Sequence, residues 1–246
     1  MSKNVETKIV KKKRINFARL LVVILVLYIL SCFLIYVYKE PVRHFEIKGN
    51  NYVTDMDILR DAKLDNYPAY VSLSNKKVNK LLKNNPLINK VTLKHGLNFT
   101  IYMDVTENIP VFINKSTNEV CLSDGTMIEN DNKYTGLPVL LNNTTEEKRK
   151  LFAKNFSKLS EGVKIMVNEI EYSPSYNSKN QIIDENRFLL SMTDKNLVYV
   201  TINKINLLDS YLDIIATEKL TDKGTLFLDG DETRHSFKKF GDWNEN

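Results

Sequence analysis

The chain has 246 residues, of which 26% are charged and 43% hydrophobic, and this balance excludes both wholesale disorder and a protein with many membrane spans. Two cysteines exclude a disulfide scaffold, three histidines leave little for a metal site, and the eight glycines form no phosphate-binding motif, so we expect no cofactor. The net charge of +5 comes from residues 1–19, which hold seven Lys or Arg against one Glu, so the rest of the chain has no basic excess for nucleic acid.

Residues 20–38 form an apolar stretch of nineteen residues without a charge. As a helix with a rise of 1.5 Å per residue it would be about 28 Å long, close to the ~30 Å hydrocarbon core of a bilayer. A buried core helix and a cleaved signal peptide are the alternatives. The stretch is longer than a signal-peptide core, and it ends in Tyr36-Val37-Tyr38-Lys39 instead of small residues. We therefore expect an uncleaved transmembrane helix.

The basic tail sets the expected orientation of this helix. Lys and Arg accumulate on the cytoplasmic side of membrane spans, so residues 1–19 are expected in the cytoplasm, in contact with anionic membrane lipid. Residues 39–246 then lie outside, and every later apolar run is too short for a second span. Cys32 lies in the membrane stretch and Cys121 far from it, so the two cannot pair within one chain.

The segment after the membrane stretch has the pattern of a small domain with both helices and strands. Apolar alternation predicts strands, and [ST]-x-x-[DE] spacing at Thr54 together with Pro86 marks helix boundaries. The expected elements, in order, are a strand at 42–48, a helix that begins at Thr54, a helix from Ser74 to Asn84, and strands at 88–94 and 98–107.

Residues 109–229 have the pattern of a larger mixed domain of short strands and two helices. Thr144 to Glu147 has capping-box spacing and opens the first expected helix, which buries Leu151. The second expected helix runs from Ile205 to Ala216 and buries Leu212. Between them, the polar residues 175–186 are expected to form a loop. Gly224 leads into the last expected strand, at 225–228.

Three short strings of residues carry a resemblance to a known family. They are Phe45-Glu46-Ile47-Lys48-Gly49-Asn50 with Val53-Thr54, then Asn85-Pro86-Leu87-Ile88, then Val105-Thr106-Glu107-Asn108-Ile109-Pro110-Val111. Behind a basic tail and a single anchor, this series resembles the POTRA domain of the bacterial division protein family FtsQ/DivIB. The element order of the following region resembles the family's second, larger β domain.

The resemblance implies an α+β fold class: a single transmembrane helix, a POTRA domain of order βααββ, and a larger mixed α/β domain with an edge strand near the C-terminus. The implied division of the chain is a cytoplasmic tail at 1–19, a transmembrane helix at 20–38, the POTRA domain at 39–108, the β domain at 109–229 and a C-terminal tail at 230–246.

The resemblance also implies a function. It indicates a non-enzymatic scaffold of the division complex, located in the cell membrane at the septum, that binds FtsL-like and FtsB/DivIC-like partners and helps to organise septal peptidoglycan synthesis. Because family members hold these partners through the closing region, and edge strands recruit other chains by strand addition, the expected partner-binding residues are Thr225, Leu226, Phe227 and Leu228. The open alternative is that this strand only completes the core, without a partner.

Two other classes of function stay open, a membrane-anchored wall enzyme and a peptidoglycan-binding module. Ser74 with Lys77, and Ser236 with Lys239, have the S-x-x-K spacing of a penicillin-binding nucleophile, but the S-D-N and K-T-G motifs that accompany it are missing. Cys121 could serve a thiol enzyme. The three histidines, however, are expected at the membrane edge, in a turn and near the C-terminal end.

A cluster of acidic residues follows the last expected strand. Asp229, Asp231 and Glu232 offer three carboxylates but no recognisable calcium loop, so we expect a solvated turn and no metal site. No motif points to a small-molecule substrate.

Overall fold

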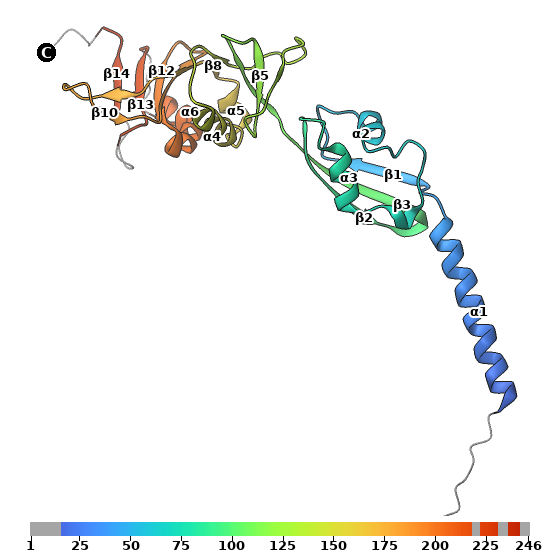
Figure 1. Cartoon of the computed structure of the whole chain (residues 1–246). Helices are drawn as coiled ribbons and strands as arrows, with labels where there is room; N and C mark the ends of the chain where they lie inside the picture. Colours follow the sequence, from blue (N-terminus) through green and yellow to red (C-terminus); the bar gives the residue numbers. More distant parts are fainter. Residues whose placement is uncertain (1–15, 218–221, 231–235, 242–246) are drawn as a thin grey trace, which may run out of the picture.

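The structure is a computed structural model that describes residues 16–217, 222–230 and 236–241. Helix α1 (Phe17–Lys39) leads into a membrane-proximal domain, residues 40–108, and then into a distal domain, residues 109–241, so that the molecule is elongated (Figure 1). Each domain has its own cluster of buried hydrophobic residues. This architecture confirms the α+β fold class predicted from the sequence.

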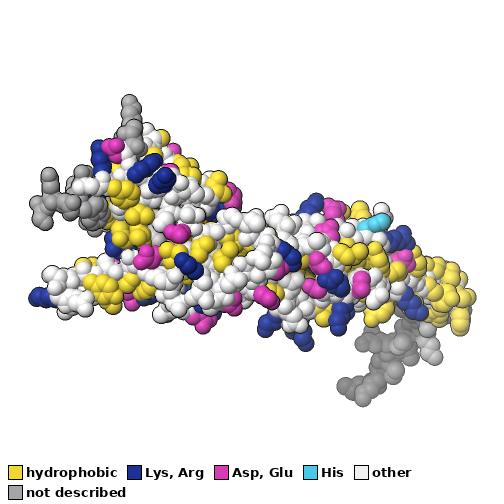
Figure 2. All heavy atoms as spheres, turned by 90° about the horizontal axis from the view of Figure 1, so that it is seen from above, with side chains coloured by type: hydrophobic (Ala, Val, Ile, Leu, Met, Phe, Trp, Pro, Cys, Tyr) yellow, Lys and Arg dark blue, Asp and Glu magenta, His cyan; other side chains and the backbone are white. Residues whose placement is uncertain are grey.

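Helix α1 is apolar on all sides. It has 23 residues, and none of them is buried against the rest of the protein. In the described part of the chain it is the one helix that is long and apolar enough to cross a membrane. Figure 2 shows hydrophobic side chains gathered at this end of the molecule, while both charge signs are mixed over the membrane-proximal domain. A helix without a polar face, none of whose residues is buried against the protein, is suited to lipid.

The membrane-proximal domain has the predicted order of strand, two helices and two strands. Its sheet has the strand order β1-β3-β2, in which β1 is parallel and β2 antiparallel to β3. Buried residues of the helices and of the sheet form one core. The elements are β1 (His44–Lys48), α2 (Asp55–Asp61), η1 (Tyr70–Ser72), α3 (Asn75–Leu82), β2 (Ile88–His95), η2 (Leu97–Phe99) and β3 (Thr100–Glu107).

Side-chain caps explain where the helices of this domain begin. The Thr54 hydroxyl accepts a hydrogen bond from the Asp57 backbone N–H, and the Ser74 hydroxyl accepts one from Lys77, which satisfies donors that have no partner inside the helix. The strand expected from residue 98 begins two residues later. Asn98 and Phe99 have φ values of 54° and 58°, so they form a left-handed turn that cannot continue a strand.

The distal domain is built around a mixed sheet of nine strands among the described residues, in the order β14-β13-β12-β11-β8-β7-β4-β5-β6. The helices pack together beside this sheet (Figure 1). The elements are β4 (Pro110–Asn114), β5 (Glu119–Leu122), β6 (Met127–Glu129), β7 (Val139–Leu140), α4 (Glu146–Phe156), α5 (Glu161–Lys164), β8 (Val167–Tyr172), β9 (Ser175–Tyr176), β10 (Ile182–Asp184), β11 (Arg187–Met192), β12 (Leu197–Thr201), η3 (Ile202–Ser210), α6 (Tyr211–Thr217), β13 (Gly224–Phe227) and β14 (Ser236–Lys239).

Several local expectations for the distal domain differ from the structure. The cap of α4 is Thr145 and not Thr144, and Leu151 is 40% exposed because it falls on the outer face of the helix. The expected helix at 205–216 is a 3₁₀ segment, η3, followed by α6, and Leu212 is 45% exposed. The expected loop at 175–186 contains the short hairpin β9–β10.

The prediction that residues 225–228 form an edge strand is wrong. Strand β13 pairs in parallel with β12 on one side and antiparallel with β14 on the other. Thr225, Leu226 and Leu228 are buried, and Phe227 is half-buried. Among the described residues, the last strand of the sheet at the C-terminal side is β14, which lies in the region that the sequence assigned to a tail. Whether residues 225–228 bind a partner stays a prediction.

A buried polar residue, Asn196, ties three elements of the distal domain together. Its side-chain amide donates to Asp194 Oδ2 and to the Tyr211 hydroxyl, both at 3.0 Å, and its Oδ1 accepts the Gly224 backbone N–H at 3.1 Å. Asn196 is 1% exposed. Burial and the neighbouring Asp194 carboxylate raise the pKa of Tyr211, so its hydroxyl stays protonated and donates to Asp194 Oδ2 at 2.7 Å.

We expect Asn196→Ala to lower the free energy of unfolding by about 2 kcal/mol, because the Gly224 N–H and the Tyr211 hydroxyl lose a buried partner. The measurement is urea unfolding of the purified chain in detergent micelles, followed by near-ultraviolet circular dichroism. Asn89→Ala, at an exposed position of β2, is the control and should change stability by less than about 0.5 kcal/mol. Equal stability of the two variants would contradict the structural role of Asn196.

Candidate interaction surfaces

The C-terminal end of the sheet presents a ladder of stacked side chains, formed by Arg187, Tyr199 and Phe227. The Tyr199 and Phe227 rings stack with centroids 5.4 Å apart, and the Arg187 guanidinium lies 3.5 Å from the Tyr199 centroid. Arg187 Nε also donates to Asp229 Oδ2 at 2.6 Å. Cation–π and stacking contacts of this kind order long side chains at a partly exposed surface. The ladder therefore offers a preformed combination of apolar rings and a guanidinium.

Of the four predicted partner-binding residues, only Phe227 belongs to this ladder. Leu226 and Leu228 are part of the hydrophobic core, and Thr225 is also buried. Their side chains fix the position of β13 and do not reach the surface. Asp229 is held by Arg187, which is a structural contact, while Asp231 and Glu232 lie outside the described residues.

Gly224 allows β14 to approach β13 closely. A Cβ atom at this position would collide with the Lys238 carbonyl oxygen and come within 2.7 Å of the Phe237 ring. Phe237 packs against the core of the distal domain, while Ser236 is exposed at the start of β14. Gly224, which precedes the last strand expected from the sequence, thus marks a close contact between two strands.

Two of the residues considered for catalysis, Ser74 and Cys121, have structural contacts. Ser74 caps α3, and the Cys121 side chain is 0% exposed. Burial raises the pKa of the Cys121 thiol to about 12, and a thiol is nucleophilic only as the thiolate. His44 and His95 are exposed in the membrane-proximal domain, and His235 lies outside the described residues. In the described part of the chain, no three His, Cys, Asp or Glu residues gather into a group that could hold a metal ion.

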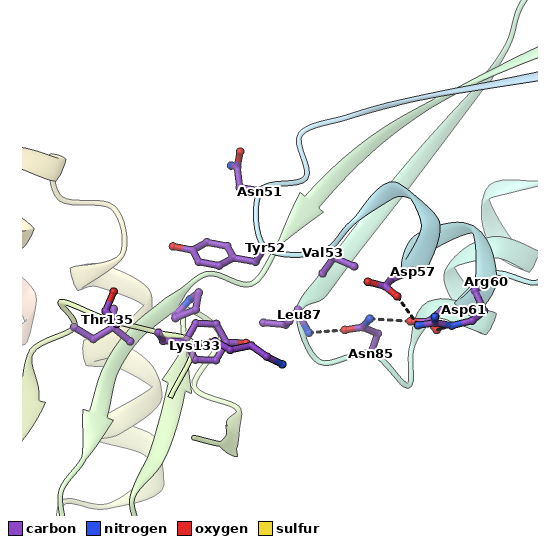
Figure 3. Close-up of a pocket in the computed structure, with 13 residues that line it drawn as sticks. Asn51, Tyr52, Val53, Asp57, Arg60, Asp61, Asn85, Leu87, Lys133 and Thr135 are labelled. Atoms are coloured by element: carbon purple, nitrogen blue, oxygen red, sulfur yellow. Dashed lines mark hydrogen bonds and ion pairs between the residues drawn. The ribbon is translucent and has the colours of Figure 1, made fainter. Parts of the chain in front are cut away.

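A groove of about 610 Å³ lies between the two domains (Figure 3). Tyr52 on one side and Tyr134 on the other face each other with ring centroids 6.2 Å apart. Burial and the charges of Glu161 and Glu107 raise the pKa of Tyr52. The charged side chains that line the groove already have partners: Arg60 pairs with Asp57, Asp61 accepts a hydrogen bond from Asn85, and Lys133 pairs with Asp131. The groove is therefore a junction between the domains, and its charged side chains are not available for a ligand.

Glu107 and Asn108 lie at the junction, where β3 ends; Glu107 bonds within the membrane-proximal domain, and Asn108 bonds across to the distal domain. The Glu107 carboxylate accepts hydrogen bonds from the backbone N–H groups of three successive residues, 51 to 53, at 2.9 to 3.1 Å. Asn108 is buried, and its amide donates to Pro86 O in one domain and to Asp124 Oδ2 in the other. No free linker separates the domains, because Asn108, the last residue of the membrane-proximal domain, bonds to both.

We expect Glu107→Gln to weaken the attachment of the loop at residues 51 to 53 to the end of β3 by about 1 kcal/mol, since bonds to a charged acceptor are stronger than bonds to a neutral amide. Hydrogen exchange of the amides at residues 51 to 53 should become about fivefold faster, which is the factor that corresponds to this energy. Glu129→Gln, at an exposed position of β6, is the matched control and should leave these rates unchanged. Unchanged rates in Glu107→Gln as well would show that the carboxylate does not hold this loop.

A second expectation concerns Cys121. In the chain with Cys32→Ser, Cys121 is the remaining thiol, and iodoacetamide at pH 8 should not modify it in the folded protein because it is buried and protonated. Unfolding in urea should expose it to full modification. Rapid reaction in the folded state would instead favour a thiol enzyme.

Comparison with known proteins identifies related sequences. A family model described as "POTRA domain, FtsQ-type" matches residues 40–108. The chain is 26% identical to cell division protein DivIB of Bacillus subtilis (strain 168), over 97% of this chain and 91% of that protein. DivIB of Staphylococcus pseudintermedius is 34% identical over 39% of this chain, and DivIB of Staphylococcus aureus (strain NCTC 8325 / PS 47) is 28% identical over 61%.

The chain spans nearly the whole Bacillus relative but only 32% and 35% of the lengths of the two Staphylococcus relatives. Among solved structures, the major extracytoplasmic domain of the trans isomer of DivIB from Geobacillus stearothermophilus aligns with a TM-score of 0.36 and 20% identity, over 48% of this chain and 99% of that chain.

Proposed function

We propose that this chain, which belongs to the FtsQ/DivIB family of bacterial cell-division proteins, is a non-enzymatic scaffold of the division complex. It is a single-pass membrane protein, with α1 as its membrane helix. In the proposed arrangement the N-terminal tail lies in the cytoplasm, and both domains lie outside the membrane at the division septum. There they bind FtsL-like and FtsB/DivIC-like partners and help to organise septal peptidoglycan synthesis.

The observation that supports this proposal most directly is the position of β14, the last strand of the distal sheet in the described part of the chain. The strand lies at the end of the molecule opposite α1 (Figure 1). A partner strand that extends this sheet through main-chain hydrogen bonds would pair next to β14. In this proposal residues 225, 226 and 228 support the site from the core, and Phe227 contributes to the surface that the partner contacts.

The ladder beside β14 supplies the side-chain part of the same surface. Aromatic residues and arginine are the side chains that contribute most to protein interfaces, and Arg187, Tyr199 and Phe227 present both types already ordered. Strand addition gives affinity through the main chain, whereas such side chains give specificity. The combination fits a peptide segment of a protein partner better than it fits a wall polymer.

The role proposed for this end of the sheet can be tested against its other end. Replacement of Ser236 in β14 by the photo-crosslinker p-benzoylphenylalanine should give cross-links to division proteins in growing cells. The same replacement of Glu129 in β6, an exposed position at the opposite end of the sheet, is the matched control. We expect several-fold more cross-linked partner from position 236, identified by mass spectrometry as a membrane-anchored division protein.

Phe227→Ala should reduce the cross-links from position 236, because it removes one ring of the ladder. Cross-links from position 129 alone would contradict the assignment to β14. Specific labelling of Ser74 or Ser236 by a penicillin probe would instead favour a wall enzyme, and recovery on purified peptidoglycan without a protein partner would favour a polymer-binding module.

A further inference from the structure

The membrane helix passes into the membrane-proximal domain without a flexible spacer. Helix α1 ends at Lys39, and the chain then bonds directly to two turns of the domain. Pro41 and Ala69 form a β-bridge. The backbone hydrogen bonds at this junction are Tyr70 N to Glu40 O at 2.9 Å, Val42 N to Pro68 O at 3.0 Å and Arg43 N to Phe99 O at 2.9 Å. Turns η1 and η2 are therefore fixed next to the end of the membrane helix.

Aromatic rings reinforce this junction. The Phe99 ring contacts Tyr36, in the last turns of α1, edge-on at 6.5 Å, and contacts Tyr70 of η1 at 5.4 Å. The Arg43 guanidinium lies 5.2 Å from the Phe99 centroid. The Tyr70 hydroxyl donates to Gly96 O at 2.7 Å. Tyrosines near the end of a membrane helix belong to the interfacial layer, so the Phe99 ring lies at or next to the depth of that layer.

The turn that carries Phe99 also carries the most exposed large apolar side chain of the membrane-proximal domain. Leu97 is 88% exposed, and Val71 in the neighbouring turn η1 and Tyr38 at the end of α1 are exposed as well. Tip residues of surface turns are usually small or polar. None of these three side chains belongs to the hydrophobic core of the domain. The core thus gives no reason for an apolar residue at position 97.

We propose that this membrane-proximal tip, defined by Tyr38, Val71 and Leu97, sits in the outer lipid surface, with Leu97 inserted at the boundary between headgroups and acyl chains. The proposal rests on α1 being the membrane span. The tip is continuous with the lipid-facing surface of α1, because backbone bonds and the Tyr36–Phe99 contact hold both at the same level. Lys39 flanks it and suits the phosphate groups of lipids, whereas Arg43, beside the Phe99 ring, already pairs with Glu40.

Lipid is favoured over a protein partner as the occupant because the tip lies where the bilayer surface already meets the domain. An exposed leucine beside basic residues is typical of segments that bury an apolar side chain in the headgroup region. A membrane helix of another protein, packed beside α1, is the alternative occupant, and the test below separates the two.

The test places a polarity-sensitive probe at the tip of the full chain. Leu97→Cys in the Cys32→Ser background is labelled with the fluorophore NBD and reconstituted alone into nanodiscs of phosphatidylcholine and phosphatidylglycerol. Cys121 does not interfere because it is buried. Met56→Cys, 70% exposed on α2 at the side of the domain away from α1, is the matched control.

We expect blue-shifted emission from position 97 and at least a twofold loss of intensity with lipids brominated in the acyl chain, and neither effect at position 56. Emission from position 97 that matches position 56 would overturn the proposal. The proposal would also be overturned if the emission from position 97 shifts to the blue only after a partner protein is added to the nanodisc. As a second readout, a probe at Val71→Cys should lose at least half of its quenching when Leu97→Asp is introduced, and unchanged quenching would overturn the role of Leu97.

Discussion

The backbone pairing of β13 with both β12 and β14 determines which side chains and which strand edge lie at the surface of the distal domain. Gly224 lets β14 approach, since a side chain there would collide with the Lys238 carbonyl oxygen. Asn196 then fixes the start of β13 by accepting the Gly224 N–H and connects it to Tyr211 on α6. Because of this pairing, Leu226 and Leu228 are core residues, and the Tyr199 and Phe227 rings stack across two neighbouring strands. In the described part of the chain, the sheet then ends at β14 and not at β13. The surface proposed for partners thus depends on buried polar bonds.

Much of the fold could be predicted because its signals are local. The apolar stretch at 20–38 and the caps at Thr54 and Ser74 each depend on residues within one or two helical turns, and the structure has α1, α2 and α3 at these places. Strand β14 could not be predicted in this way. Its four residues are mostly polar and exposed, so their strand conformation comes from pairing with β13 and not from their own pattern. The prediction of an edge at 225–228 failed for the same reason.

The residues of the interaction surfaces show the same division between local and distant signals. Phe227 was found from the sequence because it lies in a short β-prone run, but its neighbours in space, Arg187 and Tyr199, come from other strands and share no motif with it. Glu107, at the end of β3, bonds to amides of its own domain that lie more than fifty positions earlier in the chain. At the membrane end, Leu97 is conspicuous only once its exposure and its distance from the core are known. Stacking between strands and contacts between domains leave no periodic trace in the sequence.

The two junctions of the chain have a mechanical consequence. At the first, backbone bonds join the end of α1 to the membrane-proximal domain, and at the second, the buried Asn108 bonds to both domains without a spacer. Strand β14 therefore lies at the end of an elongated molecule, opposite the membrane helix (Figure 1). If β14 is the partner site, as proposed, a partner anchored in the same membrane needs a stalk long enough to bring its binding segment to this distance from the bilayer, so stalk length would be a criterion by which partners are selected.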